Sequence, residues 1–465
     1  MANQRLYFIG AGGIGMANLV RYYLLRGAEV AGYDRTSSAL TAALEKEGAA
    51  IVYDDDPKLI GEPWRDAGNT LVVRTPAVPE SNRQLRWFRD HGFRIVKRAE
   101  LLGEITRHRK GICVAGSHGK TTTSSMIANI LRHTPEGCNA FLGGILRNIN
   151  SNFVSAPQSP WAVIEADEYD RSFHHLSPFI AVVTSTDPDH LDIYGDEAGY
   201  LEGFARFTEL VEPGGTLIVH TGLKLKPRVR RGVDVLSYSG GSEGDWHARD
   251  VRYGDGELRL TITGPGVEIV DISLGVPVEI NIDNAVAAAA AATLAGATPQ
   301  HIKRGLEEFQ GAKRRFEIWN DGKDGTPVLI DDYAHSPNEV KASIESVKRL
   351  YPGRRLSVVF QPHLYTRTRD FAPEFAAALS AADEVIMPEI YPAREQPIPG
   401  VDSGLIMKDV KCESKRLIER KDLLNLIKNS NFDILMTLGA ADIDRLLPDI
   451  QHILKGKITP VGEGA

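Results

Sequence analysis

The stretch that decides the fold of this chain is Gly111-Ile112-Cys113-Val114-Ala115-Gly116-Ser117-His118-Gly119-Lys120-Thr121-Thr122-Thr123. Its apolar start predicts a buried strand, and the residues after the glycines predict a helix. Glycines at such a turn let backbone N–H groups face phosphate oxygens, while a lysine adds charge and a threonine hydroxyl can ligate Mg²⁺. Strict P-loop spacing would put a glycine where Val114 stands, but the context is that of a nucleotide phosphate site. The alternative is a capped helix with an incidental lysine.

Two later runs place acidic residues and a histidine where strands should end. Residues 161–168 (WAVIEADE) deliver Glu165, Asp167 and Glu168, and residues 181–190 (AVVTSTDPDH) deliver Asp187, Asp189 and His190. Magnesium takes oxygen-rich octahedral coordination and keeps several waters. We expect Glu165 and His190 to join Thr121 in a metal site beside Lys120, whereas solvated loop carboxylates are the alternative for most of this set.

A second glycine loop lies near the start of the chain. Gly10-Ala11-Gly12-Gly13-Ile14-Gly15 fits G-x-G-x-x-G between a predicted strand and helix, and Asp34 closes the next strand. That pattern is the dinucleotide fingerprint, but it encodes only backbone access to a diphosphate at a helix N-terminus. It therefore predicts a diphosphate site without specifying nicotinamide. A glycine turn used only for packing is the alternative.

Bulk composition bounds the class of protein. The 465 residues are too many for one compact core, and 42% hydrophobic with 25% charged residues is ordinary for a chain that folds throughout. A net charge of -7 with scattered Lys and Arg offers no footprint for nucleic acid. We therefore expect three domains and no nucleic-acid partner.

The cysteines and the apolar runs bear on the compartment. Cys113, Cys138 and Cys412 lie far apart without metal-ligand spacing, which fits core packing in a reducing compartment. The start of the chain has no basic leader, and no apolar run reaches the ~20 residues that span a bilayer. These features predict a cytoplasmic protein without a membrane partner.

Hydrophobic patterning predicts an α/β fold in three parts. Short apolar runs alternate with amphipathic helices up to about Thr106, and a second such unit opens at Gly111, as in parallel sheets with crossover helices. Residues from about 251 to 280 alternate with period two, as antiparallel strands do, and an alanine-rich helix follows. A third α/β unit follows Gly311. The expected domains are residues 1–106, 107–312 and 313–465.

Two clusters in the third part are unusually polar for strand ends. They are Asp331-Asp332-Tyr333-Ala334-His335-Ser336-Pro337 and Gln361-Pro362-His363-Leu364-Tyr365-Thr366-Arg367-Thr368-Arg369. Histidine can accept a proton near neutral pH, and arginine can hold a carboxylate or phosphate bidentately. A lone histidine is more often structural, but these two clusters together favour a site at adjacent strand ends.

Taken as a set, these segments resemble the Mur ligases, and within that family the branch that adds L-alanine. The motifs that carry the resemblance, in chain order, are FIGAGGIGM, GSHGKTTT, EADEYDRSF, DPDHLDIYG, NIDNAVAAAAA, GAKRRFE, DDYAHSP, FQPHLYTRTRDF and YPAREQPIPGVDS. The resemblance implies a Rossmann-like domain for a uridine nucleotide, a central ATPase domain and a C-terminal Rossmann-like domain. It also implies that ATP activates the lactyl carboxylate of UDP-N-acetylmuramate as an acyl phosphate, which the amine of L-alanine then attacks.

The resemblance assigns roles to residues of this chain. The residues implied for ATP are Gly116, Ser117, His118, Gly119, Lys120, Thr121, Thr122, Asn281, Asn284, Arg315 and Asp332. Those implied for the UDP-sugar are Gly12, Gly13, Ile14, Gly15, Asp34, Arg35, Thr36, Thr75 and Arg98. Those implied for L-alanine are Tyr333, His335, His363 and Arg367, and those implied for Mg²⁺ are Thr121, Glu165 and His190. Lys120, Glu165, His190, His335, His363 and Arg367 are the expected catalytic residues.

The chain departs from the family pattern at several positions. Ser336 replaces a second histidine, Leu364 replaces an arginine, and Ile280 replaces a histidine before the adenine motif. Neither Ser336 nor Leu364 can supply the acid–base or anchoring function of the residue it replaces. Later Mur ligases carry a modified lysine shortly after the metal-site histidine, but no lysine occurs between His190 and Lys224. That absence favours the alanine-adding branch.

Three other functions stay open from the sequence. A murein-peptide ligase would share the acceptor and ATP but add a preformed tripeptide. An NAD-dependent oxidoreductase could be built on the first glycine loop, but it leaves the GSHGKTTT loop unexplained. A silent nucleotide-binding regulator is disfavoured by Lys120, Glu165 and His190. The expected assembly is a monomer or a homodimer.

Overall fold

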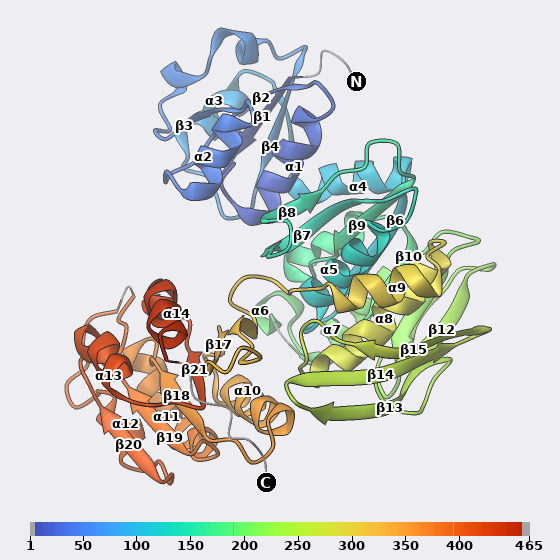
Figure 1. Cartoon of the computed structure of the whole chain (residues 1–465). Helices are drawn as coiled ribbons and strands as arrows, with labels where there is room; N and C mark the ends of the chain where they lie inside the picture. The colour runs from blue at the N-terminus through green and yellow to red at the C-terminus, as the bar shows by residue number, and fades with distance from the viewer. Residues whose placement is uncertain (1–4, 189, 394, 458–465) are drawn as a thin grey trace. The chain divides into compact units, whose positions relative to one another are not determined.

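A computed structural model describes residues 5–188, 190–393 and 395–457. These described residues form three sheets of five, ten and six strands, each accompanied by helices (Figure 1). It divides into two compact units, Met1–Arg249 with Thr261–Ile272 and Ile282–Phe309, and Asp250–Leu260 with Ser273–Asn281 and Gln310–Ala465. The expected α/β class, with Rossmann-like sheets before and after a larger central sheet, is confirmed.

The first sheet is wholly parallel and has the strand order β3-β2-β1-β4-β5. Its strands are β1 (Arg5–Ile9), β2 (Glu29–Tyr33), β3 (Ala50–Val52), β4 (Thr70–Arg74) and β5 (Arg94–Lys97), and its helices are α1 (Ile14–Leu24), α2 (Ala39–Lys46) and α3 (Arg83–Asp90). The order reverses between β1 and β4, and ligands of open α/β sheets bind at such a switch point. The glycine loop follows β1 at this point.

Strand β1 shows why this sheet is covered on both faces. Leu6 and Phe8 pack in one buried cluster, while Tyr7 and Ile9 pack in another. Side chains alternate across a strand, so a continuous apolar run fills the core on each side. The run of apolar residues at the start of the chain therefore specifies a central strand.

The central sheet has the order β15-β14-β13-β12-β11-β10-β6-β9-β7-β8. Its strands are β6 (Lys110–Ala115), β7 (Asn139–Leu146), β8 (Ser151–Val154), β9 (Trp161–Glu165), β10 (Pro178–Val183), β11 (Thr216–His220), β12 (Asp234–Ser239), β13 (Trp246–Gly254), β14 (Glu257–Gly264) and β15 (Val267–Ser273). The helices in this part of the chain are α4 (Arg98–His108), α5 (Lys120–Leu131), α6 (Leu191–Tyr194), α7 (Glu197–Thr208), α8 (Ile280–Leu294) and α9 (Pro299–Glu307). Two-residue turns join β13 to β14 and β14 to β15, so these strands run antiparallel as expected.

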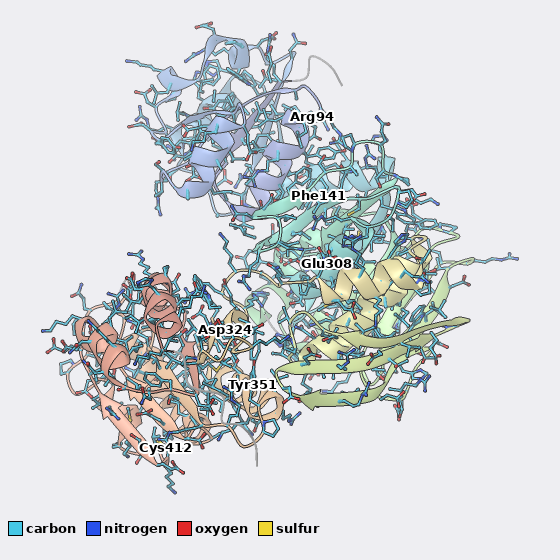
Figure 2. All side chains as sticks on the ribbon, in the orientation of Figure 1. Arg94, Phe141, Glu308, Asp324, Tyr351 and Cys412 are labelled. Atoms are coloured by element: carbon cyan, nitrogen blue, oxygen red, sulfur yellow. The ribbon has the colours of Figure 1, made fainter. Side chains whose placement is uncertain are left out.

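Helix α1 of the first sheet packs directly on the β7–β8 hairpin of the central sheet. The Tyr22 and Phe141 ring centroids lie 5.2 Å apart, and Figure 2 labels Phe141. Asn18 Nδ2 donates to the Leu142 carbonyl at 2.9 Å, and Asn152 Nδ2 donates to the Ile14 carbonyl at 2.7 Å. These contacts bring the first glycine loop to the edge of the central sheet.

The third sheet has the order β16-β17-β21-β18-β19-β20 and is parallel except for β16. Its strands are β16 (Glu317–Asn320), β17 (Val328–Asp332), β18 (Leu356–Phe360), β19 (Glu384–Met387), β20 (Ser414–Leu417) and β21 (Ile434–Leu438). Its helices are α10 (Pro337–Leu350), α11 (Tyr365–Leu379), α12 (Gly404–Met407), α13 (Leu423–Asn429) and α14 (Leu447–Lys455). The polar clusters follow β17 and β18, but these strands are not adjacent because β21 lies between them.

The surroundings of the free cysteines bear on the expectation that they pack in the core. Cys113 and Cys138 are buried, and Cys412 is half-buried before β20 (Figure 2). Burial raises the pKa of the Cys138 thiol to about 12, so this thiol is unreactive at neutral pH.

Within the described residues, no helix combines the length and apolar character needed to cross a membrane.

Helix α9 packs on helix α5 through a glycine. A Cβ on Gly305 would lie 2.5 Å from Ile130 Cα, and Asn129 Nδ2 donates to the Gly305 carbonyl at 2.6 Å. We predict that Gly305→Ala lowers the free energy of unfolding by about 1–3 kcal/mol, because overpacking forces the two helices apart. Urea unfolding followed by circular dichroism measures it.

Gly241→Ala is the matched control, because a Cβ there would meet only Ser239 Oγ at 3.8 Å. It should change the free energy of unfolding by less than about 0.5 kcal/mol. Equal stability of the two variants would contradict the proposed close approach of the helices.

Candidate functional site

The predicted phosphate loop lies at the carboxyl end of β6, between two neighbouring strands. Val114 pairs with Glu165 on β9, and Ala115 pairs with Val183 on β10. Gly116 and Gly119 adopt φ values of +146° and +80°, and a Cβ on Gly116 would lie 2.0 Å from Thr184 Oγ1. The turn therefore requires glycine at both positions.

The loop is held by the segment that follows β10 and by helix α8. Ser117 Oγ donates to the Asp187 carbonyl at 2.6 Å, and the backbone N–H of His118 donates to Ser185 Oγ at 2.7 Å. The His118 imidazole is exposed and lies 3.8 Å from the Asp187 carboxylate. Thr123 Oγ1 donates to Asn284 Oδ1 at 3.0 Å, so Asn284 contacts the start of the helix that follows the loop.

Lys120 begins helix α5, and its ammonium is almost enclosed. Its Nζ lies 3.0 and 2.9 Å from the two carboxylate oxygens of Glu168, and the Glu168 side chain is only 3% exposed. Burial raises the pKa of Glu168, although the nearby Lys120 charge opposes that shift. Glu168 is therefore a buried counter-ion of the loop lysine rather than a solvated loop carboxylate.

Glu165 ends β9 beside the loop. Its Oε2 accepts the backbone N–H of Gly143 at 3.1 Å, and a Cβ on Gly143 would lie 2.3 Å from the same oxygen. The His190 and Tyr169 ring centroids lie 5.2 Å apart, edge to face. Both Tyr169 and Glu165 line one cavity, so the structure brings the predicted metal residues Glu165 and His190 to the same region.

The donor chemistry of Thr121, Glu165 and His190 suits a magnesium ion that also takes phosphate and water oxygens. Within residues 5–188, 190–393 and 395–457, no group of three or more His, Cys, Asp or Glu is arranged to hold a metal. The predicted set contains only two residues of those types, together with the Thr121 hydroxyl. Asp189, one of the acids of this segment, lies outside the described residues.

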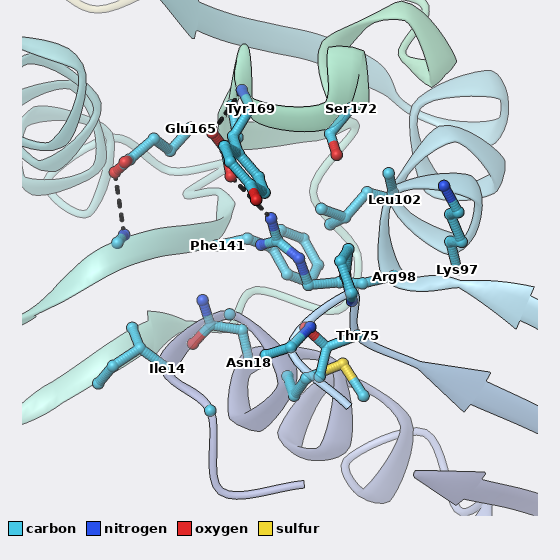
Figure 3. A pocket seen from close by; sticks show the side chains of 18 of the residues that line it. Ile14, Asn18, Thr75, Lys97, Arg98, Leu102, Phe141, Glu165, Tyr169 and Ser172 are labelled. Carbon is cyan, nitrogen blue, oxygen red and sulfur yellow. Dashed lines mark hydrogen bonds and ion pairs between the residues drawn. The ribbon is translucent and has the colours of Figure 1, made fainter. Parts of the chain in front are cut away.

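A cavity of ≈ 470 Å³ joins the first glycine loop to Glu165 (Figure 3). Of the residues predicted for the UDP-sugar, Gly13, Ile14, Gly15, Thr75 and Arg98 line it. Lys97, Phe141, Tyr169 and Ser172 complete much of the remaining wall. The first sheet thus supplies one side of the cavity and the central sheet supplies the other.

Arg98 holds the junction between these two sides. A Cβ on Gly15 would lie 2.3 Å from Arg98 Nη1, so the guanidinium rests directly on the glycine loop. Arg98 Nη2 donates to Asp167 Oδ2 at 3.3 Å, a contact drawn in Figure 3. Helix α4 places Arg98 in its first turn, where the side chain reaches the cavity.

Four predicted UDP-sugar residues do not line the cavity, namely Gly12, Asp34, Arg35 and Thr36. Asp34 accepts the backbone N–H of Gly12 at 2.8 Å and that of Thr36 at 3.1 Å, one on each carboxylate oxygen. Arg35 and Thr36 are exposed. Asp34 therefore fastens the glycine loop to the end of β2.

In the second unit, the first polar cluster is organised around Tyr333. The Tyr333 ring is 41% exposed, its centroid lies 5.1 Å from that of His335, and His335 Nδ1 lies 3.0 Å from the Tyr333 carbonyl. The Asp332 carboxylate accepts the Phe316 N–H at 3.1 Å and the Ser343 hydroxyl, and burial raises its pKa. Tyr333 and His335 are brought together, while Asp332 is engaged with the protein itself.

Arg314 packs against the Tyr333 ring of this cluster, a contact that the sequence did not predict. Its guanidinium carbon lies 5.0 Å from the Tyr333 ring centroid, and its nitrogens donate to the Gly439 and Ala441 carbonyls at 2.6 and 3.1 Å. Burial raises the pKa of the adjacent Asp331 to about 7. The predicted neighbour Arg315 is exposed, so the two arginines of the KRRF motif have different surroundings.

The second polar cluster lies at the start of α11. The His363 ring stacks on Tyr391 with centroids 6.0 Å apart, and Arg367 lies in the first turn with its buried Nη1 lacking a hydrogen-bond partner among the described residues. Leu364 has a φ of +71° immediately before the helix.

Asn281 and Ser336 both make hydrogen bonds within the protein itself. Asn281 is buried and donates to the Val276 carbonyl at 3.0 Å. Ser336 caps α10, with its hydroxyl accepting the Glu339 N–H at 3.4 Å and Glu339 accepting the Ser336 N–H at 3.0 Å. The residue that replaces the family histidine thus acts as a helix cap.

Sequence reasoning also missed Gly143 and underrated Asp167 and Glu168. The motif EADEYDRSF contained both acids, but their pairing with Arg98 and Lys120 joins residues far apart in the chain. Gly143 carries no motif that marks it. Only the close approach of β7 to β9 shows why it must be small.

His220, at the end of β11, forms an ion pair with Asp283 beside Asn284. Its Nε2 lies 2.9 Å from Asp283 Oδ1 and its Nδ1 lies 2.6 Å from the Thr221 carbonyl, so both nitrogens can donate only when the ring is protonated. The hydrogen bond to Asp283 raises the pKa of His220. Burial would raise the pKa of Asp283, but His220 and the Gly240 N–H together lower it.

We predict that this pair stabilises the fold below the unfolded-state pKa of histidine, about 6.5, and that the effect is lost as pH rises through the higher folded-state pKa of His220. The thermal midpoint of His220→Gln should therefore lie below that of the native chain at pH 6, with a gap that narrows toward pH 9. Asp283→Asn should show the same narrowing. A gap independent of pH would contradict the ion pair.

Three family models match successive parts of the chain. They describe a Mur ligase family catalytic domain over residues 5–110, a Mur ligase middle domain over residues 114–292, and a Mur ligase glutamate ligase domain over residues 314–440. Their order follows the three sheets.

Similar proteins match over nearly the full length. The UDP-N-acetylmuramate–L-alanine ligase of Parabacteroides distasonis is 51% identical over 449 residues, covering 97% of both chains. That of Phocaeicola vulgatus is 51% identical over 455 residues, covering 98% of this chain and 99% of its own. A crystal structure of UDP-N-acetylmuramate-alanine ligase from Thermotoga maritima has a TM-score of 0.77 at 25% identity, covering 97% of this chain and 99% of its own. The matched models and the identity of these relatives show that the chain belongs to the Mur ligase family.

Proposed function

We propose that this protein is an ATP-dependent ligase that joins L-alanine to the lactyl carboxylate of UDP-N-acetylmuramate through an acyl phosphate. The observation that carries the proposal is the cavity that runs from Gly13, Gly15 and Arg98 to Glu165, beside the phosphate loop. Such a cavity can hold a diphosphate at one end and present a carboxylate to ATP at the other. The names of the full-length relatives support the same reaction.

The glycine loop after β6 would hold ATP. Its backbone N–H groups at the start of α5 favour the phosphates, and Lys120 supplies a positive charge for the transferring phosphoryl group. Asn284 contacts the loop through Thr123 and would bind the nucleotide from the other side. Asn281, Arg315 and Asp332 are proposed ATP contacts from the family motifs.

The reaction would have two steps. The lactyl carboxylate attacks the terminal phosphorus of ATP, which forms the acyl phosphate and releases ADP. The neutral amine of L-alanine then attacks the acyl carbon, and the tetrahedral intermediate expels phosphate while the amine loses a proton. Thr121, Glu165 and His190 would hold Mg²⁺, which supplies positive charge beside the phosphates when bound.

L-Alanine would bind in the second unit. Arg367 is suited to its carboxylate, since its buried Nη1 has no protein acceptor in the described part of the chain. His335 and His363 are the proposed acceptors of the amine proton, and Tyr333 would border the amino acid. Ser336 and Leu364 take no part in this chemistry.

The alternatives from the sequence have less support. In an NAD-binding site the acidic residue after β2 contacts the ribose, but both oxygens of Asp34 already accept backbone N–H groups. A silent regulator would not need Lys120 and Glu165 beside a cavity lined by the first glycine loop. ATP and a nucleotide sugar as substrates are consistent with a cytoplasmic monomer or homodimer that acts on small molecules.

A phosphate-release assay tests the proposal. We expect turnover only when ATP, UDP-N-acetylmuramate and L-alanine are all present with Mg²⁺. A preformed tripeptide should compete poorly with L-alanine as the amine substrate. Preference for the tripeptide would make the chain a murein-peptide ligase, and tight NADH binding without ATP turnover would make it an oxidoreductase.

We also predict that Gly143→Ala lowers kcat by roughly 10²-fold, because its Cβ would displace the Glu165 carboxylate from the cavity wall. The stability of this variant should stay close to that of the native chain if the carboxylate swings aside. Gly241→Ala, which adds a Cβ with only an ordinary contact to Ser239, is the control and should keep full turnover. Normal kcat in Gly143→Ala would remove Glu165 from the proposed reaction.

A further inference from the structure

A short acidic segment after β9 pairs with three basic residues from separate elements. We call residues Asp167, Glu168 and Asp170 the acidic strap. Asp167 pairs with Arg98 at 3.3 Å, Glu168 with Lys120 at 2.9 Å, and Asp170 with Lys97 at 2.8 Å. Three residues within a stretch of four therefore contact the ends of β5, α4 and α5.

The pairs of the strap face different sites. Lys97, Arg98 and Asp167 line the cavity proposed for the UDP-sugar, whereas Glu168 is buried against the lysine of the phosphate loop. Figure 3 shows Lys97, Arg98 and Tyr169 around this part of the cavity. Asp167 and Asp170 therefore pair with cations of the acceptor site, whereas Glu168 between them pairs with the lysine of the nucleotide site.

The backbone of the strap has little freedom to absorb a local shift. Asp170 and Arg171 have φ values of +52° and +53°, a region that side-chain-bearing residues adopt at a cost. Tyr194 donates its hydroxyl to the Glu168 carbonyl at 2.7 Å, and its ring lies 5.3 Å from the Arg171 guanidinium. A displacement of Asp167 should therefore be transmitted to Glu168 one residue away.

We propose that the acidic strap couples the two substrate sites, with Asp167 and Glu168 as positioning residues. The triphosphate competes with Glu168 for Lys120, and the anionic acceptor competes with Asp167 for Arg98. When either ion pair breaks, the acidic strap loses one restraint. The free energy needed to break the other ion pair is then lower. Each substrate then increases the affinity for the other by the same factor.

This inference rests on the proposed function, which places ATP and the UDP-sugar in these two sites. Calorimetry on the full chain tests the inference and the proposed function separately. The probes are the nonhydrolysable ATP analogue AMP-PNP with Mg²⁺ and UDP-N-acetylmuramate, without L-alanine. In the native chain, saturation with one probe should lower the Kd of the other by about five-fold or more. The factor should be equal when the order of addition is reversed.

Asp167→Asn is the main variant, because its side chain is 40% exposed and the substitution keeps its shape. This variant should bind UDP-N-acetylmuramate alone more tightly, since Arg98 loses a competing anion, while the coupling factor falls to about one. Glu168→Gln should bind AMP-PNP alone more tightly, since Lys120 loses a competing anion, and its coupling should also be lost. Glu197→Gln, which removes an exposed partner of Lys224, is the control and should keep native coupling.

The possible outcomes distinguish the coupling inference from the proposed function. A native coupling factor of one, or variants of Asp167 and Glu168 that keep native coupling, would overturn the inference while leaving the proposed function intact. Failure of the native chain to bind either probe would instead refute the proposed sites. Loss of coupling in Glu197→Gln as well would show that the effect does not belong to the strap.

Discussion

The position of β6 between β9 and β10 is the constraint on which the rest of the site depends. Parallel pairing brings the carboxyl ends of all three strands to one edge, with Val114 beside Glu165 and Ala115 beside Val183. The chain must then turn sharply from β6 into α5, and Gly116 and Gly119 make that turn with positive φ. The predicted phosphate loop, the acid of β9 and the segment that follows β10 are neighbours because the three strands that precede them are paired in parallel.

Buried charge organises the surroundings of this edge. Lys120 and Glu168 are both nearly inaccessible, and two such charges are tolerated in the interior only as a close pair. Arg98 similarly connects the first glycine loop to Asp167. The two cations of this edge, Lys120 and Arg98, are thus held in place by carboxylates of the chain itself.

In the third sheet, Arg314 is the cation that groups of the chain itself hold in place. Arg314 lies under Tyr333, near the buried Asp331, and its donors also satisfy carbonyls at the end of β21. It holds β16, β17 and β21 at the edge where the polar residues emerge. The strands that carry the polar clusters, β17 and β18, are separated by β21, which pairs with both.

The sequence by itself determined the α/β class, the sheets and both glycine loops, because hydrophobic period and glycine conformation are local properties. It also placed Glu165, His190 and Arg98 near a site, through motifs. It named Glu168 only as one of several loop acids, and it did not identify Gly143 or Arg314, because their roles arise from contacts between distant segments. It expected the clusters after β17 and β18 to adjoin, but strand order depends on packing of the whole sheet. Tertiary structure alone decided which charges are buried together, since burial depends on neighbours that the local sequence does not contain.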